Sequence, residues 1–371
     1  MSQNEYPLFD AHGMPFRKLG ASGLRVPLFS LGGWLTLGGS VTGDHIKEII
    51  QAAFTHGINM FDTAEAYAKG NSELEMGRVI KELGYKRSDL VITTKIFWGP
   101  RSGPNDTGLS RKHIIEGTQD SLARLQMTYV DVIFAHRHDH TVPMEEIVRT
   151  FNYVIEKGWA HYWGTSEWSA QEIEQAHQES TTVDIAATLN LIPPIAEQMQ
   201  HNMFHRERPE KEYAWVASAF RTALYKNYGY GTTVWSPLAG GILTGKVYSD
   251  GIPEDSRFGS EPTFKGRAQS RLKGAEGQTK IAKVKQLAQV AESLDTTTTA
   301  LALSWLARNP NTSTIILGVT SVSQLLQNLK ALEILPKLGE EHMVKIEEIL
   351  DNKPEPSSTH GWSPLDVYGK V

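Results

Sequence analysis

Short apolar runs alternate with amphipathic segments along most of this chain, and this alternation restricts its possible folds more than any other feature. The run Ile58–Phe61 follows a glycine and is mostly apolar, which is typical of a buried parallel strand. The flanking segments 44–55 and 72–84 carry apolar residues at helical spacing. Each begins at a residue type that caps helices, Asp44 and Ser72 respectively. The pattern therefore predicts repeated strand–helix units.

The same reasoning extends the alternation over both halves of the chain. Core strands are expected at 29–31, 58–61, 90–94, 129–135, 160–166, 195–198, 232–235 and 314–317. Helices are expected at 44–55, 72–84, 110–125, 144–155, 205–225, 279–294, 298–308, 321–332 and 340–350, with another after Ser169. This rhythm, unbroken by any shift in composition, predicts one closed TIM (β/α)8 barrel of the α/β class.

The barrel domain is expected to span residues 16–353, with irregular termini at 1–15 and 354–371. A turn rich in glycine and serine predicts a β-hairpin near the N-terminus, and extra helices follow the last strand. The segment 248–274 is charged and rich in glycine, so we expect a mobile loop there. The alternative is an open doubly wound sheet, but no Gly-x-Gly-x-x-Gly follows the first strand.

Composition excludes several classes of function. The formal net charge of −5 argues against nucleic acid as the main partner. The sequence contains no cysteine, which rules out disulfides and thiolate chemistry. No apolar run is long enough to span a membrane, and the N-terminus has no signal-peptide core. We therefore expect a cytoplasmic protein without membrane insertion.

Four ionisable residues fall at or just after the ends of three predicted strands. Asp62, Lys95 and His136 each end an apolar run, and Tyr67 follows Asp62 by one loop. Taken singly, Asp62 could cap a helix, Tyr67 could be a core aromatic residue, and Lys95 could be a solvated charge. Their joint spacing favours a site, because α/β proteins build active sites at the carboxyl ends of parallel strands.

These residue types suit a general acid. A tyrosine has an ordinary pKa of about 10, so we expect Lys95 to lower the pKa of Tyr67 and Asp62 to keep Lys95 charged and in place. His136 could donate a hydrogen bond to the same reacting oxygen. Such donors suit a carbonyl that becomes an alkoxide as a hydride arrives. Because the chain also lacks a Gly-x-Ser-x-Gly motif, we expect the hydride to come from a bound cofactor.

Several longer strings resemble a known family. The strings 59–67, 93–95, 164–166 and 235–238 look like the signature set of the aldo-keto reductases. The strings 91–99 and 109–117 are similar to one branch of it, the voltage-gated potassium channel β subunits. The resemblance implies an NADPH-dependent carbonyl reductase with Asp62, Tyr67, Lys95 and His136 as its catalytic tetrad. The channel branch often has Asn at position 136, and His at this position favours working catalysis.

The resemblance also implies a binding site for NADPH or NADP+. Its residues would be Gly33, Trp34, Asp62, Ser166, Gln198, Trp235, Ser236, Pro237, Leu238, Gly240, Lys246, Arg257, Gly318, Thr320, Gln324, Gln327 and Asn328. Ser166 and Gln198 would hold the carboxamide, and Trp235 would stack on the nicotinamide ring. The later residues would enclose the pyrophosphate, the adenine and the 2′-phosphate. Glu167 and Gln327 depart from the branch, which more often has Arg and Glu there.

Two other motifs have rival readings. His136, His138 and His140 could bind a metal if they faced one side of a strand. The predicted strand ends at His136, however, so we expect no metal site. The segment 240–246 fits most of a P-loop, but Val247 stands where a magnesium-binding Ser or Thr is needed. That segment could still offer backbone N–H groups to a pyrophosphate.

Two functions remain open at this stage. One is reduction of small aldehydes or ketones, with Tyr67 as the general acid. The other is a redox-sensing β subunit of a voltage-gated potassium channel with slow catalysis. In the second case, the resemblance implies a channel α subunit as partner and a homo-tetramer. The sequence identifies neither the substrate nor an interface.

Overall fold

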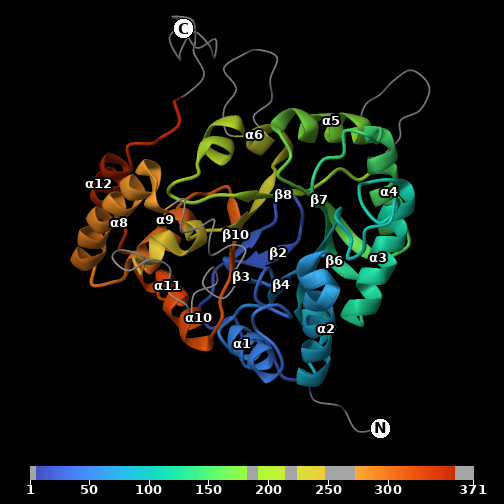
Figure 1. Ribbon diagram of the computed structural model, residues 1–371, viewed down its shortest axis with the longest axis horizontal. Helices are drawn as coiled ribbons and strands as arrows, with labels where there is room; N and C mark the ends of the chain where they lie inside the picture. The colour runs from blue at the N-terminus through green and yellow to red at the C-terminus, as the bar shows by residue number, and fades with distance from the viewer. Residues whose placement is uncertain (1–5, 182–190, 214–223, 247–271, 356–371) are drawn as a thin grey trace, which may run out of the picture.

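Eight parallel strands close into a barrel in the computed structural model, which describes residues 6–181, 191–213, 224–246 and 272–355 (Figure 1). The strands are β3 (Phe29–Gly32), β4 (Met60–Asp62), β5 (Val91–Ile96), β6 (Val130–Ala135), β7 (Ala160–Ser166), β8 (Ala196–Gln200), β9 (Gly231–Trp235) and β10 (Thr312–Leu317). Neighbours follow chain order, and β10 pairs with β3 to close the ring. The TIM barrel predicted from the alternation is confirmed.

Helices surround the barrel on all sides in Figure 1. They are α1 (Asp44–Thr55), α2 (Asn71–Leu83), α3 (Arg111–Leu125), α4 (Met144–Glu156), α5 (Ala170–Thr181), α6 (Leu224–Tyr228), α8 (Ala275–Ser293), α9 (Thr298–Ala307), α10 (Val322–Leu329), α11 (Ala331–Ile334) and α12 (Glu340–Leu350). The expected C-terminal helices are present, and α8 packs against both α9 and α12. A large apolar core fills the space between the strands and this outer layer.

The predicted hairpin closes one end of the barrel. It consists of β1 (Phe16–Lys18) and β2 (Arg25–Pro27), which pair antiparallel. Its Leu19 and Val26 are fully buried in a second apolar cluster with Met60, Val132 and other residues of the strands. Because the hairpin covers the ends at which the strands begin, chemistry is left to the carboxyl ends.

Some predicted boundaries are wrong in detail. Ser72 does not cap α2, which begins one residue earlier; instead the Ser72 hydroxyl is buried and accepts a hydrogen bond from Thr63 at 3.1 Å. Lys95 lies inside β5 rather than after it. The expected helix 205–225 contains a π-helical turn at Arg208–Glu212, and its residues 214–223 lie outside the described structure. Most of the expected loop 248–274 also lies outside it.

Helix caps decide several of the correct boundaries. Ser110 accepts a hydrogen bond from the backbone N–H of His113 at 3.2 Å and so begins α3, as expected. Ser169 does the same for Glu172 at 3.2 Å and begins α5. Among the described residues, no helix is both long and apolar enough to cross a membrane.

Candidate active site

Parallel pairing brings the carboxyl ends of β4, β5 and β6 together. Asp62 is the last residue of β4 and lies opposite Thr93 of β5. Lys95 of β5 lies opposite Phe134 of β6, and His136 follows that strand directly. Residues separated by up to 74 positions in the sequence therefore meet at one edge of the barrel (136 − 62).

The centre of this edge is a buried ion pair. The Lys95 ammonium lies 2.7 Å from Asp62 Oδ2 and donates a second hydrogen bond to the Thr63 carbonyl at 2.7 Å. Asp62 Oδ1 accepts hydrogen bonds from Thr93 at 2.6 Å and from the Gln198 amide at 3.1 Å. Burial is the largest single influence and disfavours the charged ammonium, but Asp62 and Tyr67 together outweigh it and raise the pKa of Lys95. Lys95 therefore carries its charge at neutral pH.

Tyr67 lies beside this pair but is not made acidic by it. The Lys95 ammonium is 4.9 Å from the centre of the phenol ring. Burial raises the pKa of Tyr67, Lys95 opposes that shift, and the charge of Asp62 adds to it. Lys95 does act to lower the pKa of this phenol, as expected, but loss of hydration is the larger effect, so the net shift is upward and the expected acidic phenol is not found. The phenol keeps its proton at neutral pH and can still donate it.

His136 faces Tyr67 from the adjacent strand end. Its ring centre is 5.8 Å from that of Tyr67 and 4.6 Å from that of Trp98. Burial lowers the pKa of His136 well below its usual range, and the charges of Lys95 and Arg137 lower it further. The imidazole is therefore neutral. Its buried Nδ1 has no hydrogen-bond partner within the described part of the chain, so this ring keeps a polar atom free for a ligand.

A second buried carboxylate positions the wall of the site. Glu65 Oε1 accepts hydrogen bonds from the backbone N–H groups of Phe97 at 2.6 Å and Gly99 at 3.0 Å. His113 Nε2 lies 3.1 Å from the same oxygen. These contacts fix the turn that carries Trp98 next to His136. Our sequence reasoning missed Glu65, although a carboxylate in the short loop between Asp62 and Tyr67 was a visible signal.

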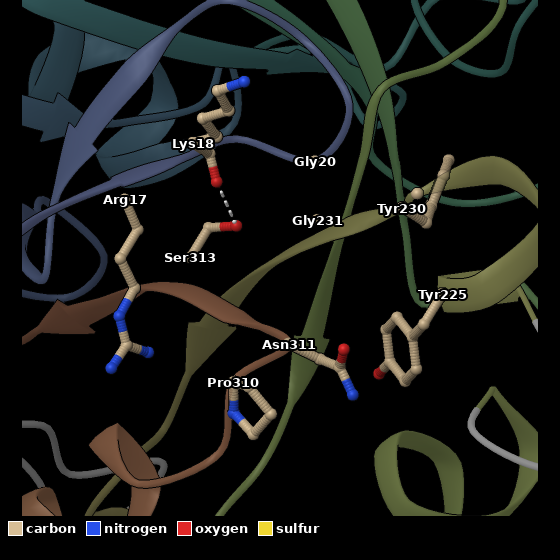
Figure 2. A pocket seen from close by; sticks show the side chains of 10 residues that line it. Arg17, Lys18, Gly20, Tyr225, Tyr230, Gly231, Pro310, Asn311 and Ser313 are labelled. Atoms are coloured by element: carbon tan, nitrogen blue, oxygen red, sulfur yellow. Dashed lines mark hydrogen bonds between the residues drawn. The ribbon is translucent and has the colours of Figure 1, made fainter.

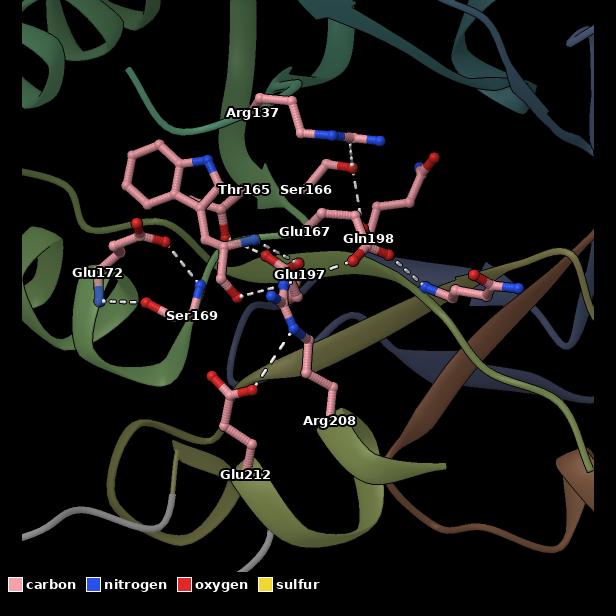
Figure 3. Close-up of polar contacts among 12 residues, drawn as sticks. Arg137, Thr165, Ser166, Glu167, Ser169, Glu172, Glu197, Gln198, Arg208 and Glu212 are labelled. Atoms are coloured by element: carbon pink, nitrogen blue, oxygen red, sulfur yellow. Dashed lines mark hydrogen bonds and ion pairs between the residues drawn. The ribbon is translucent and has the colours of Figure 1, made fainter. Parts of the chain in front are cut away.

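The expected carboxamide residues also lie at this edge (Figure 3). The Ser166 hydroxyl donates to the Gln198 carbonyl at 2.9 Å and accepts from Arg137 at 3.3 Å. Because the Gln198 side chain also reaches Asp62, these groups are continuous with the ion pair. Arg137 was not predicted; it follows His136 and packs over the Trp98 ring at 4.9 Å.

Glu167 holds Trp235 in place. Its Oε1 accepts hydrogen bonds from the Trp235 indole at 2.9 Å and from the Gln200 backbone at 2.6 Å. Its Oε2 lies 3.4 Å from Arg208. Glu167 has a φ of 59°, an uncommon backbone conformation for a residue with a side chain. The acidic residue is thus paired on both oxygens.

The chain passes along the same edge at Gly33 and after β9. The Gly33 N–H donates to the Asp62 carbonyl at 2.8 Å, and a Cβ there would lie 2.4 Å from the Ser72 hydroxyl. Trp34 follows directly. After β9, Ser236 and Ala239 have positive φ, and the 3-10 segment Ala239–Thr244 leads to the exposed Lys246. Gly240 and Gly241 have positive φ and interrupt this segment, and Gly240 is exposed.

The end of β10 carries the last group of predicted cofactor residues. Ser321 caps α10, and the backbone N–H of Thr320 donates to the Gln324 side chain at 3.0 Å. Asn328 is buried, whereas Gln327 is exposed. Pro237 and Leu238 follow the carboxyl end of β9 and Gly318 follows that of β10, whereas Gln324, Gln327 and Asn328 lie in α10. Arg257 lies outside the described residues.

A pocket at the opposite end of the barrel carries a different set of residues (Figure 2). It lies between the hairpin and the starts of β9 and β10. Its Arg17 guanidinium donates to the carbonyls of Ala307, Asn309 and Thr312 at 2.6 to 3.1 Å. That cation already serves to join the hairpin to β10, and the pocket contains none of the predicted catalytic residues.

Comparison with known proteins agrees with this geometry. A sequence model of the Aldo/keto reductase family matches residues 29–351. A Schizosaccharomyces pombe protein is 51% identical over 93% of this chain and 96% of its own length. Relatives from Arabidopsis thaliana and Oryza sativa are 47% and 44% identical, covering 92% and 94% of this chain and 98% and 100% of their own. All three carry the provisional name of voltage-gated potassium channel subunit beta. The chain therefore belongs to the aldo/keto reductase family.

Proposed function

We propose that this protein is an NADPH-dependent oxidoreductase that reduces aldehydes or ketones to alcohols, with Tyr67 as the general acid. The observation that carries the proposal is the buried pair of Lys95 and Asp62, 2.7 Å apart, beside a protonated phenol and a neutral imidazole. A structural ion pair alone does not require an unpaired imidazole nitrogen next to it. A carbonyl oxygen, which only accepts hydrogen bonds, suits this set of donors.

Each side chain has a separate part in this chemistry. Tyr67 holds the proton that the product oxygen takes, and the Lys95 ammonium stabilises the phenolate left behind. Asp62 keeps Lys95 charged and, through Gln198, ties it to the next strands. His136 offers a neutral N–H to the same oxygen, while Trp98 covers the imidazole and limits the access of water.

The cofactor supplies a hydride from its reduced nicotinamide when it is bound. Ser166 and Gln198 would hold its carboxamide, and Trp235, fixed by Glu167, would pack on the ring. The turn after β9 and Lys246 would meet the pyrophosphate, with Arg257 beyond them. The exposed Gly240 of that turn fits such a ligand, while His136 Nδ1, which has no hydrogen-bond partner in the described part of the chain, is left for the substrate. Gln324, Gln327 and Asn328 would contact the adenine and the 2′-phosphate.

The test is a Tyr67→Phe variant. It removes the proton donor and leaves the ring, so NADPH binding measured by quenching of tryptophan fluorescence should stay within twofold of the parent. Consumption of NADPH with 4-nitrobenzaldehyde should fall by about 100-fold or more, as expected for loss of general acid catalysis. A variant that reduces the aldehyde at the parent rate would show that Tyr67 is not the acid.

We also propose a second role, as a cytoplasmic β subunit of a voltage-gated potassium channel, on the strength of the names of the three relatives. In that role the protein would form a homo-tetramer, bind a channel α subunit, and report the redox state of its cofactor by slow catalysis. Co-purification with a voltage-gated channel α subunit expressed in the same cells tests it. Recovery of the protein without the channel, at matched expression, would count against this role.

A further inference from the structure

Three side chains that can bind metals, and that the proposed reaction does not use, lie together on the rim of the barrel. His138 and His140 belong to the loop between β6 and α4, and Glu172 lies in the first turn of α5. One ligand atom from each lies within 4.8 Å of the other two. The side chains of His138 and Glu172 are 13% and 20% exposed, whereas that of His140 is 79% exposed. This group, the rim cluster, is therefore anchored on one side and open to solvent on the other.

The spacing of the rim cluster fits a small divalent ion. His138 Nδ1 lies 3.0 Å from His140 Nδ1 and 3.3 Å from Glu172 Oε1. His140 Nε2 lies 3.8 Å from the same carboxylate oxygen. In a tetrahedral zinc site with bonds of about 2.0–2.2 Å, neighbouring ligand atoms are about 3.3–3.6 Å apart. Each imidazole offers one nitrogen to an ion, so a cation held by the rim cluster would engage one nitrogen of His138, one nitrogen of His140 and Glu172 Oε1.

The loop that carries the two histidines is held in shape by the residue between them. Asp139 Oδ2 accepts from the Leu109 N–H at 2.8 Å. Its Oδ1 accepts from the N–H of Thr141 at 3.0 Å and from the hydroxyl of that residue at 2.6 Å. A Cβ at Gly108 would lie 2.6 Å from Asp139 Oδ2, so only glycine fits there without displacing it. With Asp139 fixed in this way, His138 and His140 turn to a common side.

The carboxylate of Glu172 is also held in position. Glu172 Oε2 accepts from the Ser169 N–H at 2.7 Å, and the Glu172 N–H donates to the Ser169 hydroxyl at 3.2 Å, as Figure 3 shows. This reciprocal cap leaves Oε1 to face the histidines. The His138 ring also packs against the Trp168 ring in a T-shaped arrangement, with 4.8 Å between ring centres. Supporting contacts of this kind orient the ligands of metal sites.

We propose that the rim cluster binds one divalent first-row transition-metal ion, such as Zn²⁺, through His138, His140 and Glu172, with a further coordination position open to solvent. Two imidazoles and one carboxylate favour zinc over the hard ions magnesium and calcium, which prefer oxygen ligands. The bound ion would join the loop after β6 to α5. The site differs from the three-histidine site weighed from the sequence, because His136 faces Tyr67 instead and Glu172 takes its place.

The experiment uses the full chain without an affinity tag. Titration with Zn²⁺, followed by calorimetry, should show one equivalent bound. Titration with Co²⁺ should produce the visible absorption of an ion bound by imidazole. Glu172→Gln, which can still cap α5, and His140→Asn should each weaken binding at least about tenfold, because each removes a ligand. The control is His45→Asn: His45 pairs with Glu48 at 3.3 Å on an exposed helix face but belongs to no group of three ligands among the described residues.

Affinity that is unchanged in both ligand variants, or lowered equally by His45→Asn, would mean adventitious surface binding and would overturn the proposal. Binding of less than one equivalent to the parent would do the same. X-ray absorption of the parent with one equivalent of Zn²⁺ gives a readout that needs no variant. It should show two imidazoles and oxygen ligands at about 2.0–2.2 Å, and a shell of oxygen alone would exclude the site.

Discussion

Replacement of Asp62 by asparagine tests the electrostatic core of the site most directly. The change keeps the size of the side chain but removes its charge. Asp62 Oδ1 serves Thr93 and Gln198, while Oδ2 meets the Lys95 ammonium at 2.7 Å. An asparagine that keeps the first two contacts must point its own NH₂ group at the ammonium. In either orientation of the amide, hydrogen-bond donors face each other in a buried place.

The expected loss of stability follows from how deeply the Lys95–Asp62 pair is buried. The side chains of Lys95 and Asp62 are 0% and 4% exposed. Two unit charges 2.7 Å apart attract by about 6 kcal/mol at an effective dielectric constant of about 20. Loss of one partner from a buried pair costs about 3–5 kcal/mol, because the remaining charge is left without compensation. We expect the free energy of unfolding to fall by that amount at pH 7.

The slope of the stability against pH that Lys95 causes should also have opposite signs in the parent and in Asp62→Asn. In the parent, the pKa of Lys95 is raised, so its stabilising charge is present through neutral pH and is lost only as pH rises through that raised pKa. In Asp62→Asn, burial is no longer opposed by the charge of Asp62, and Tyr67 keeps its proton, so the pKa of Lys95 should fall below the unfolded value of about 10.4. Between the lowered pKa of Lys95 in the folded variant and its pKa in the unfolded chain, the variant should gain up to about 1.4 kcal/mol of stability for each pH unit.

The assay is urea unfolding of parent and variant at several pH values from 7 to 9, followed by tryptophan fluorescence. The difference between the two proteins should shrink as pH rises. Glu145→Gln is the matched control, because Glu145 also lies 2.7 Å from its cation, Arg149, but both side chains are about half exposed. It should cost less than about 1 kcal/mol. An equal loss in both variants, or a difference for Asp62→Asn that does not shrink with pH, would refute the reasoning.

Two further predictions concern other buried groups. Glu65→Gln should loosen the turn that carries Trp98 and raise the KM for the aldehyde about tenfold, since charge-assisted hydrogen bonds position that turn. The affinity for NADPH should stay within twofold; steady-state kinetics that show an unchanged KM would contradict the role of Glu65. Burial lowers the pKa of His177 to about 4, so the protein should lose about 3 kcal/mol of stability as pH falls from about 6.5 to 4. His177→Phe, which can keep the stacking on Tyr228 at 4.1 Å, should remove that part of the acid sensitivity in urea unfolding, and an unchanged slope would exclude it.

The residues at the carboxyl ends of the strands could be predicted from sequence, because each of them follows an apolar run. Asp62, Lys95 and His136 were each identified by the same signal, and parallel strands bring such ends to one edge by geometry alone. The caps at Ser110 and Ser169 were also readable, because capping depends on neighbours within one turn. The cap assigned to Ser72 failed because Thr63, nine positions away, holds that hydroxyl instead.

What the sequence determined by itself was therefore periodic and local: the number and order of strands, most helix starts, and the residues that share the edge of the proposed site. Tertiary structure alone decided the state of those residues. It raises the pKa of Tyr67 by burial despite the adjacent Lys95, makes Glu65 a clamp on the Trp98 turn, and places Glu172 beside His138. The physical reason is that hydration and long-range contacts depend on which distant groups surround an atom, and spacing along the chain does not specify them.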